Sequence, residues 1–164
     1  MRKIAFGIAA LATVAAAPAM AATATATMPV SVDIINSCTV AATPMSFGAP
    51  AAIGSANIDS TSTISLVCTN GATYDVSLDN GLNATSGQRY MSNGATTPVK
   101  IPYNLYRDSA RSSVWGTTTG TNTVTGTTGT SGLVSMTAYG RIPASATSVG
   151  AGAYLDTVTV TVTF

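Results

Sequence analysis

The last nine residues of the chain, DTVTVTVTF (156–164), alternate almost perfectly between polar and apolar side chains. Threonines occupy one face, and the other face carries Val158, Val160, Val162 and Phe164. Successive side chains of a strand point to opposite faces, so this pattern predicts a β-strand with one buried and one solvated face. The sequence offers no turn and no further strand after Phe164. We therefore expect one edge of this strand to lack a partner from its own chain.

A second alternating stretch, ATATATMPVSVDII, covers residues 22–35. Its apolar side chains fall at even positions: Ala24, Ala26, Met28, Val30, Val32 and Ile34. The pattern predicts another amphipathic strand, unpaired at the opposite end of the chain. Pro29 interrupts it, because proline has no N–H to give to a sheet. Either the Pro29 nitrogen faces a gap or pairing begins at Val30, and we favour the second reading.

Between the two ends, the chain alternates short strand patterns with turn residues and shows no helical periodicity. The expected strands are 30–35, 63–69, 74–81, 99–108, 133–142 and 154–164. Pro102 predicts an edge or a bulge within its strand. Six or more short strands separated by polar turns favour an all-β antiparallel sandwich. The Thr- and Gly-rich segment 116–132 has almost no apolar side chains, so we expect an exposed hairpin or surface loop.

The N-terminal residues 1–21 have the features of a secretory signal peptide: Arg2 and Lys3, an apolar run, and Ala19-Met20-Ala21. Removing them leaves five basic residues against six aspartates. This balance offers no attraction for nucleic acid, and no remaining stretch is apolar enough for stable membrane insertion. In an exported chain the two cysteines, Cys38 and Cys68, are expected to form a disulfide. Two buried free thiols are the alternative.

Catalysis has few candidates in this composition. The sequence has no histidine and no glutamate, so a general base for neutral pH is missing. Asp75 and Asp79 are four residues apart on a predicted strand, where we expect them to face solvent. A catalytic interpretation is also suggested by Arg107, Asp108 and Arg111, but this group does not supply the general base that is missing at neutral pH. We expect no enzyme activity, no cofactor and no metal.

Several short motifs, in this order and spacing, resemble the spore coat protein U domain family, which includes subunits of archaic chaperone–usher pili. They are NSCTV (36–40), SFG (46–48), VCTNGATYDVSLDNG (67–81), RYM (89–91), YNLYRDSA (103–110), WG (115–116), YGRIPA (139–144) and GAYLDTVTVTVTF (152–164). Together they run across the whole mature chain.

This resemblance implies an incomplete immunoglobulin-like sandwich, residues 36–164, that lacks its last strand. A periplasmic chaperone would lend a strand first, and the extension 22–35 of the next subunit would replace it at an outer-membrane usher. The donor side chains would be Met28, Val30, Val32 and Ile34. The acceptor edge would carry Val158, Val160, Val162 and Phe164. The chain would then be exported through the periplasm to the cell surface, as a pilus subunit that supports adhesion or biofilm formation, in a fibre expected to be a homopolymer.

Other interpretations remain open at this point. The C-terminal strand could be the ordinary edge of a complete sandwich, or the segment 22–35 could fold back into its own groove. Trp115 and the tyrosines could bind sugar, although packing is the commoner use of such residues. The second functional hypothesis is a secreted, spore-coat-like or adhesive binding protein that uses the loops 82–98 or 116–132. Neighbouring chaperone and usher genes would favour the pilus.

Overall fold

The computed structural model describes residues 20–164, which form eight β-strands and no helix. The strands are β1 Cys38–Ala42, β2 Ile58–Cys68, β3 Thr73–Leu78, β4 Arg89–Ser92, β5 Lys100–Tyr106, β6 Val124–Thr127, β7 Leu133–Ile142 and β8 Val160–Thr163. The predicted all-β class is confirmed. None of these residues belongs to a helix that could cross a membrane. Nearly all of the expected signal peptide, 1–21, lies outside the described residues.

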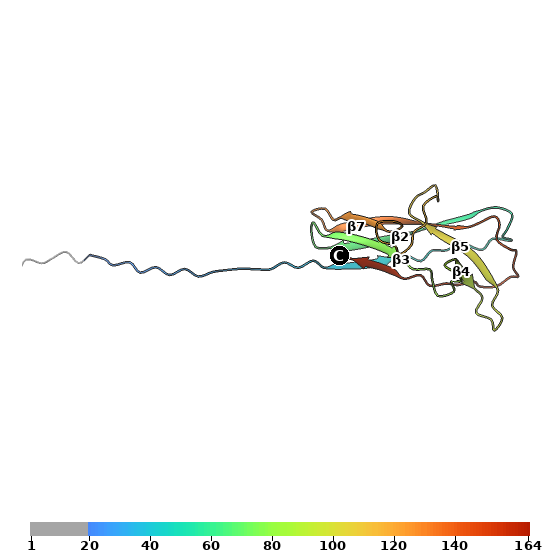
Figure 1. The fold of residues 1–164 in the computed structure, drawn as a ribbon, viewed down its shortest axis with the longest axis horizontal. Helices are drawn as coiled ribbons and strands as arrows, with labels where there is room; N and C mark the ends of the chain where they lie inside the picture. The colour runs from blue at the N-terminus through green and yellow to red at the C-terminus, as the bar shows by residue number, and fades with distance from the viewer. Residues whose placement is uncertain (1–19) are drawn as a thin grey trace, which may run out of the picture. The chain divides into compact units, whose positions relative to one another are not determined.

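Two antiparallel sheets make up the compact unit Ile34–Phe164 (Figure 1). The larger sheet has the strand order β1-β2-β7-β5-β4, and the smaller has the order β6-β3-β8. The chain thus crosses between the sheets several times, from β2 to β3, from β3 to β4, and at each step from β5 to β8, as in an immunoglobulin-like sandwich. The smaller sheet ends at β8, red in Figure 1, and no other strand of the described chain pairs with its outer edge.

Side chains from both sheets meet in one hydrophobic core. Along β2 the exposed and buried positions alternate, and Ile64 and Leu66 are almost completely buried. Val76 and Leu78 of β3 face them from the smaller sheet. Trp115 is 1% exposed, and its indole N–H donates to the Val76 carbonyl at 2.8 Å. Trp115 therefore packs in the core, as expected, and is not available to bind sugar.

β5, Lys100–Tyr106, accommodates a proline within a sheet. Pro102 lies opposite Tyr90 of β4. On its other side β5 pairs with β7 only from Asn104 to Tyr106. At Pro102 the strand therefore has a single neighbour, which is the edge environment that its missing N–H predicts.

The segment 116–132 is largely exposed, as predicted, but it also contributes β6 to the smaller sheet, which the prediction of a hairpin or surface loop did not include. Its Gly126 lies opposite Tyr74, and a Cβ at this position would lie 2.5 Å from the Tyr74 hydroxyl. Thr128 is buried, and its hydroxyl donates to the Thr69 carbonyl at 2.8 Å. Backbone pairing with β3 therefore orders this segment, and Val124 is its apolar contact with the core.

Two expected strands are shorter or missing. Regular pairing of the C-terminal strand is confined to Val160–Thr163, although Leu155 exchanges two backbone hydrogen bonds of 2.9 Å with Ser92. Residues 20–33 belong to a separate unit, and neither they nor the rest of the expected strand 30–35 form a strand. A strand needs a ladder partner, so an alternating sequence without one stays unpaired.

The predicted disulfide is present. Cys38 and Cys68 lie opposite each other in the β1–β2 register and are joined by an S–S bond of 2.06 Å. Thr69, directly after Cys68, donates its N–H to the Ser37 carbonyl at 2.9 Å and its hydroxyl to the Ile35 carbonyl at 3.1 Å. The start of the compact unit is thus attached to the end of β2 by a covalent bond and by hydrogen bonds.

Replacing Cys38 with serine should lower the stability of the domain by about 3.5 kcal/mol, because the disulfide restricts the unfolded chain. For a domain of this size that corresponds to a fall in Tm on the order of 10 °C. Thermal unfolding followed by circular dichroism measures the effect. Wild-type protein treated with a reductant is the control and should approach the variant; equal Tm values for Cys38→Ser and oxidised wild type would contradict a structural role.

Candidate functional site

The edges of the two sheets come close together along one side of the sandwich. β1 ends the larger sheet and β8 ends the smaller, and Cα atoms of the two strands approach within 8 Å without pairing. Two strands hydrogen-bonded through a third would stand about 9.5 Å apart, since neighbouring strands are spaced by about 4.8 Å. The two edges are therefore close neighbours where these contacts lie, and the open space on this side lies mostly beside the segments that follow β1 and precede β8.

Two hollows of about 500 Å³ and about 570 Å³ lie along this side. They share the residues Met45, Phe47, Met91, Tyr154 and Leu155. We call the joined hollows the groove. Its walls are the segment 42–53 on one side and the segment 149–160 on the other, so it follows the residues before β8 and reaches the start of that strand at Val160.

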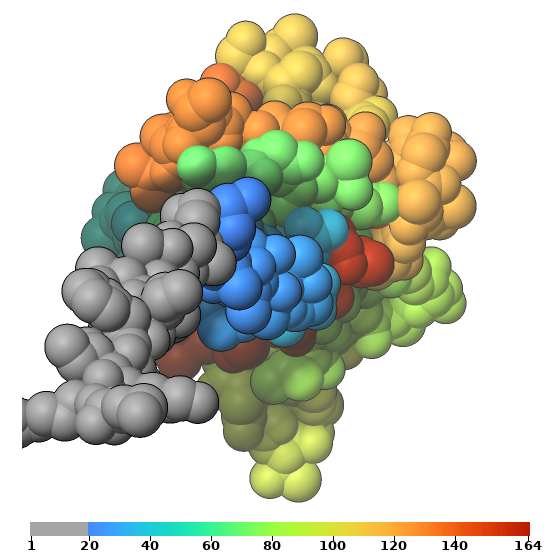
Figure 2. All heavy atoms as spheres, turned by 90° about the vertical axis from the view of Figure 1, so that its left-hand side faces the viewer, coloured from blue at the N-terminus to red at the C-terminus, as the bar shows by residue number. Residues whose placement is uncertain are grey.

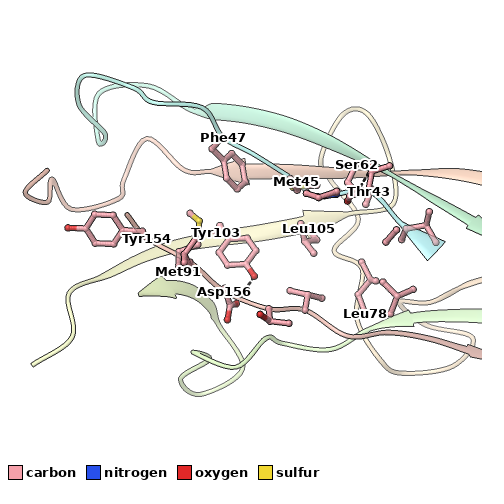
Figure 3. A pocket seen from close by; sticks show the side chains of 18 residues that line it. Thr43, Met45, Phe47, Ser62, Leu78, Met91, Tyr103, Leu105, Tyr154 and Asp156 are labelled. Carbon is pink, nitrogen blue, oxygen red and sulfur yellow. Dashed lines mark hydrogen bonds between the residues drawn. The ribbon is translucent and has the colours of Figure 1, made fainter. Parts of the chain in front are cut away.

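Apolar side chains from both layers face each other across the groove (Figure 3). Met45 and Phe47 extend from the segment that follows β1, and Tyr103 and Leu105 come from β5. The rings of Phe47 and Tyr103 meet edge to face, with centroids 6.2 Å apart. The floor of the groove is therefore part of the hydrophobic core itself, which favours an apolar occupant.

A cluster of polar side chains around Asp156 fixes the wall of the groove that the segment 149–160 forms. The Tyr103 hydroxyl donates to Asp156 Oδ2 at 2.6 Å, and the Asn83 N–H and Nδ2 donate to Oδ1 at 3.1 and 3.0 Å. Burial, reinforced by Asp156, raises the pKa of Tyr103 far above its usual value, so its hydroxyl stays a donor. Gly81 lies against the Asp156 carboxylate with a positive φ of 79°, and a Cβ there would collide with it.

Asp79 provides a second attachment for this wall of the groove. The sequence predicted a solvated aspartate at this position, whereas its carboxylate is bonded to the backbone. Its Oδ1 accepts hydrogen bonds from the N–H groups of Gly81 and Thr159, both at 2.9 Å. Burial alone would raise the pKa of Asp79, but these N–H donors and the charge of Arg89 outweigh it, so the pKa lies below its usual 3.8. Asp75 also departs from the prediction, because both of its carboxylate oxygens are buried without a hydrogen-bond partner.

Arg89 is the residue that sequence reasoning missed most clearly. Its side chain is almost completely buried, at 1% exposure, and donates to the carbonyls of Asp79, Leu78 and Trp115 at 2.8 to 3.0 Å. It thereby joins β4 to the end of β3 and to the loop that carries Trp115. A lone arginine gives no sequence signal for such a role. Met45 and Phe47 did carry one, because their spacing of two residues matches a strand face.

The structure brings together only some of the predicted acceptor residues. Val158 and Val160 line the groove, and Val162 packs against the core. Phe164 lies apart from the groove, against a separate hollow beside Tyr74 and Asp75. Phe164 is 52% exposed, in agreement with the last residues, red in Figure 2, reaching the surface.

The predicted donor side chains are among the most exposed apolar groups of the chain. Their exposures are 80–83% for Met28, Val30, Val32 and Ile34. Four such side chains in alternation form an exposed apolar face along this segment. Within residues 20–164, no three Cys, Asp, Glu or His side chains cluster closely enough to hold a metal ion.

Comparison with known proteins identifies the family. The family model of the Spore Coat Protein U domain matches residues 24–161. The chain belongs to the spore coat protein U domain family. It is also 33% identical over 171 residues to Protein U of Myxococcus xanthus, a match that covers 95% of this chain and 93% of that protein.

A solved structure shares the fold of this spore coat protein U domain. It is the CsuC–CsuE chaperone–tip adhesion subunit pre-assembly complex from the archaic chaperone–usher Csu pili of Acinetobacter baumannii. The match has a TM-score of 0.55 and 22% identity, and covers 80% of this chain. It covers 40% of the chain to which it was compared, so the likeness is one of fold over part of that protein.

We expect the Arg89→Met variant of the spore coat protein U domain to lose about 3 kcal/mol of unfolding free energy. The substitution leaves several buried carbonyl groups without their donor. Urea denaturation measures the loss. Arg141→Met is the matched control: Arg141 pairs with Asp59 at 2.7 Å but is only partly covered, so its loss should have a much smaller effect. Equal losses in the two variants would contradict a special role for Arg89.

The lowered pKa of Asp79 predicts a pH dependence. A carboxyl group whose folded pKa lies below its unfolded value stabilises the domain above that unfolded value, and this stability is lost as the pH falls below about 4. Asp79→Asn should therefore show a shallower loss of unfolding free energy between pH 5 and 2 than wild type, measured by urea denaturation at each pH. Asp33→Asn, outside the compact unit, should keep the wild-type slope; a steep slope retained in Asp79→Asn would refute the assignment.

Proposed function

We propose that the chain is a structural, non-enzymatic subunit of a surface pilus that assembles by donor-strand complementation. The observation that carries this proposal is the groove beside β8, whose free edge and apolar lining suit one more amphipathic strand. The same chain supplies such a strand in residues 22–35, with an apolar face that is 80% or more exposed from Met28 to Ile34. One subunit therefore carries both a groove and, in residues 22–35, a segment that can fill the groove of a neighbour, as a polymer requires.

In the proposed fibre, residues 22–35 of one subunit enter the groove of its neighbour. The side chains that would fill it are Met28, Val30, Val32 and Ile34. At roughly 1.5–3 kcal/mol for each buried side chain, they contribute on the order of 6–12 kcal/mol before the ordering of the donor is subtracted. Backbone hydrogen bonds along β8 add to this, and they also fix the register of the donor.

The same free edge accounts for the proposed partners. An unpaired edge with an apolar face is prone to uncontrolled pairing, so a periplasmic chaperone would cover the groove until an outer-membrane usher exchanges it for the next subunit. Membership of the spore coat protein U domain family supports this pathway, as does the likeness in fold to a chaperone–subunit complex of Csu pili. The subunit would travel through the periplasm to the cell surface, where the fibre would serve adhesion or biofilm formation.

A charge in the donor face should stop assembly. Val32→Asp would bury an unpaired carboxylate in the groove, at a cost of several kcal/mol, so the ladder of SDS-resistant polymers on cells should fall at least about tenfold. Ser31→Asp places the same charge on the opposite face of the donor and should leave the ladder near its wild-type intensity. Deletion of residues 22–35 should abolish incorporation, and wild-type amounts of polymer from that deletion would refute the proposed function.

A further inference from the structure

The outer side of the larger sheet carries most of the accessible basic residues of the chain. Five basic residues follow the expected signal peptide, and Arg89 among them is buried. Three of the other four lie on this side, together with three tyrosines. We call this group the basic-aromatic face; its members are Tyr90, Lys100, Tyr106, Arg111, Tyr139 and Arg141. We propose that the face binds an acidic polysaccharide, a chain of sugar rings that carry carboxylates.

The alternation of β5 and β7 turns these side chains away from the groove. Leu105 of β5 is buried and lines the groove, so Tyr106 points to the other side of the sheet. Ala138 of β7 is buried in the same way, so Tyr139 points outward beside Tyr106, which lies opposite it in the register. Arg141, two residues further along β7, shares this side. A donor strand in the groove therefore does not cover the face.

Contacts with the sheet hold Arg111 on the face. Its guanidinium carbon lies 5.7 Å from the centre of the Tyr139 ring, and its Nε donates to the Gly140 carbonyl at 3.2 Å. The φ angle of Arg111 is 57°, in the left-handed region that residues with a side chain rarely adopt. Such backbone strain persists only where surrounding contacts impose it, and it is concentrated at functional sites.

Asp59 joins two arginines and leaves the face positively charged. It accepts hydrogen bonds from Nε and Nη2 of Arg141 at 2.7 and 2.8 Å, and its Oδ2 lies 3.3 Å from Nη1 of Arg111. One carboxylate thus balances only one of the two guanidinium groups. Within residues 20–164, Nη1 of Arg141 has no hydrogen-bond partner, so it is available to a ligand. Asp108, in the loop that carries Arg111, bonds the backbone of that loop instead.

A second cation and ring extend the face along β5. Nζ of Lys100 lies 5.6 Å from the centre of the Tyr90 ring. Tyr90 lies opposite Pro102, and both point to the outer side because the flanking Ile101 is buried. Lys100 is six residues from Tyr106 on the same strand, which corresponds to about 20 Å. The face is therefore long enough for several consecutive sugar rings of one chain.

The residue types on the face suit sugars that carry carboxylates. Tyrosine combines a large apolar ring, on which the C–H face of a sugar can lie, with a hydroxyl that forms hydrogen bonds. Guanidinium groups bind carboxylates through charge-assisted hydrogen bonds. A neutral polysaccharide would make no use of the three cations. The combination of rings and cations on one side therefore favours a polymer of uronic-acid type.

Nucleic acid suits this face less well. Three cations allow about three phosphate contacts, fewer than the six to ten that are typical of strong DNA binding. The rest of the mature chain carries two basic residues against five aspartates, so it repels a polyanion of high charge density. A polyuronate carries its charges further apart and offers sugar faces to the tyrosines. We therefore assign the face to a polysaccharide.

Binding to alginate, a polyuronate, tests the assignment on the full mature chain with Val32→Asp, which should keep it from polymerising. Biolayer interferometry on alginate-coated sensors measures Kd at low salt, where surface charges are least screened. Tyr106→Ala, Arg141→Gln and Lys100→Gln should each raise Kd at least about fivefold. Two matched controls lie off the face and should stay within about twofold: Tyr154→Ala in the groove, and Arg107→Gln, whose guanidinium bonds the Thr123 carbonyl. Circular dichroism confirms that each variant is folded.

Several results would overturn the assignment. They are no binding of the parent chain to alginate, equal Kd values for the parent and the three face variants, equal binding to uncharged dextran, and stronger competition by single-stranded DNA than by soluble alginate. The last result would assign the face to nucleic acid. Because the assay uses a chain that does not polymerise, a negative result leaves the proposed pilus function intact, and failure of polymerisation leaves polysaccharide binding intact.

Discussion

The unsatisfied backbone along one side of β8 is the constraint on which the rest of this structure depends. Toward β3, the residues of β8 are hydrogen-bonded in register, from Leu78–Val160 to Asp75–Thr163. Toward the groove, no strand of the described chain pairs with them. An unpaired strand edge beside an apolar groove is prone to pair with another chain, so proteins cover or protect such edges. The proposed function follows from that need.

Polar contacts hold this half-paired wall in place before any partner arrives. Asp156 is bonded by Tyr103 and Asn83, and Asp79 accepts the N–H of Thr159, so the segment before β8 stays extended although it has no ladder of its own there. Arg89 in turn fixes the carbonyl groups at the end of β3. A groove that is already formed lowers the ordering cost of binding, which leaves more of the burial energy for affinity.

The alternating segments at the two ends of the chain have different surroundings and therefore different states. Val160 and Val162 have β3 beside them and form a strand. Val30 and Val32 have the same pattern, but no strand of the described residues pairs with them, and they remain exposed. The difference is one of pairing rather than of propensity, because β-structure gains most of its stability from neighbouring strands.

The sequence by itself determined the features that depend on local pattern and composition: the all-β class, the positions of β3, β5 and β7 and of the second half of β2, the alternating faces of β2, β3 and β5, and the disulfide between the only two cysteines. Tertiary structure decided what depends on contacts between distant segments. It made a strand of the Thr- and Gly-rich segment at β6, turned Asp79 from a solvated residue into an attachment for Thr159, and buried Arg89 among carbonyl groups. Each of these residues bonds a backbone group that lies elsewhere in the chain, and period and propensity carry no information about such a partner.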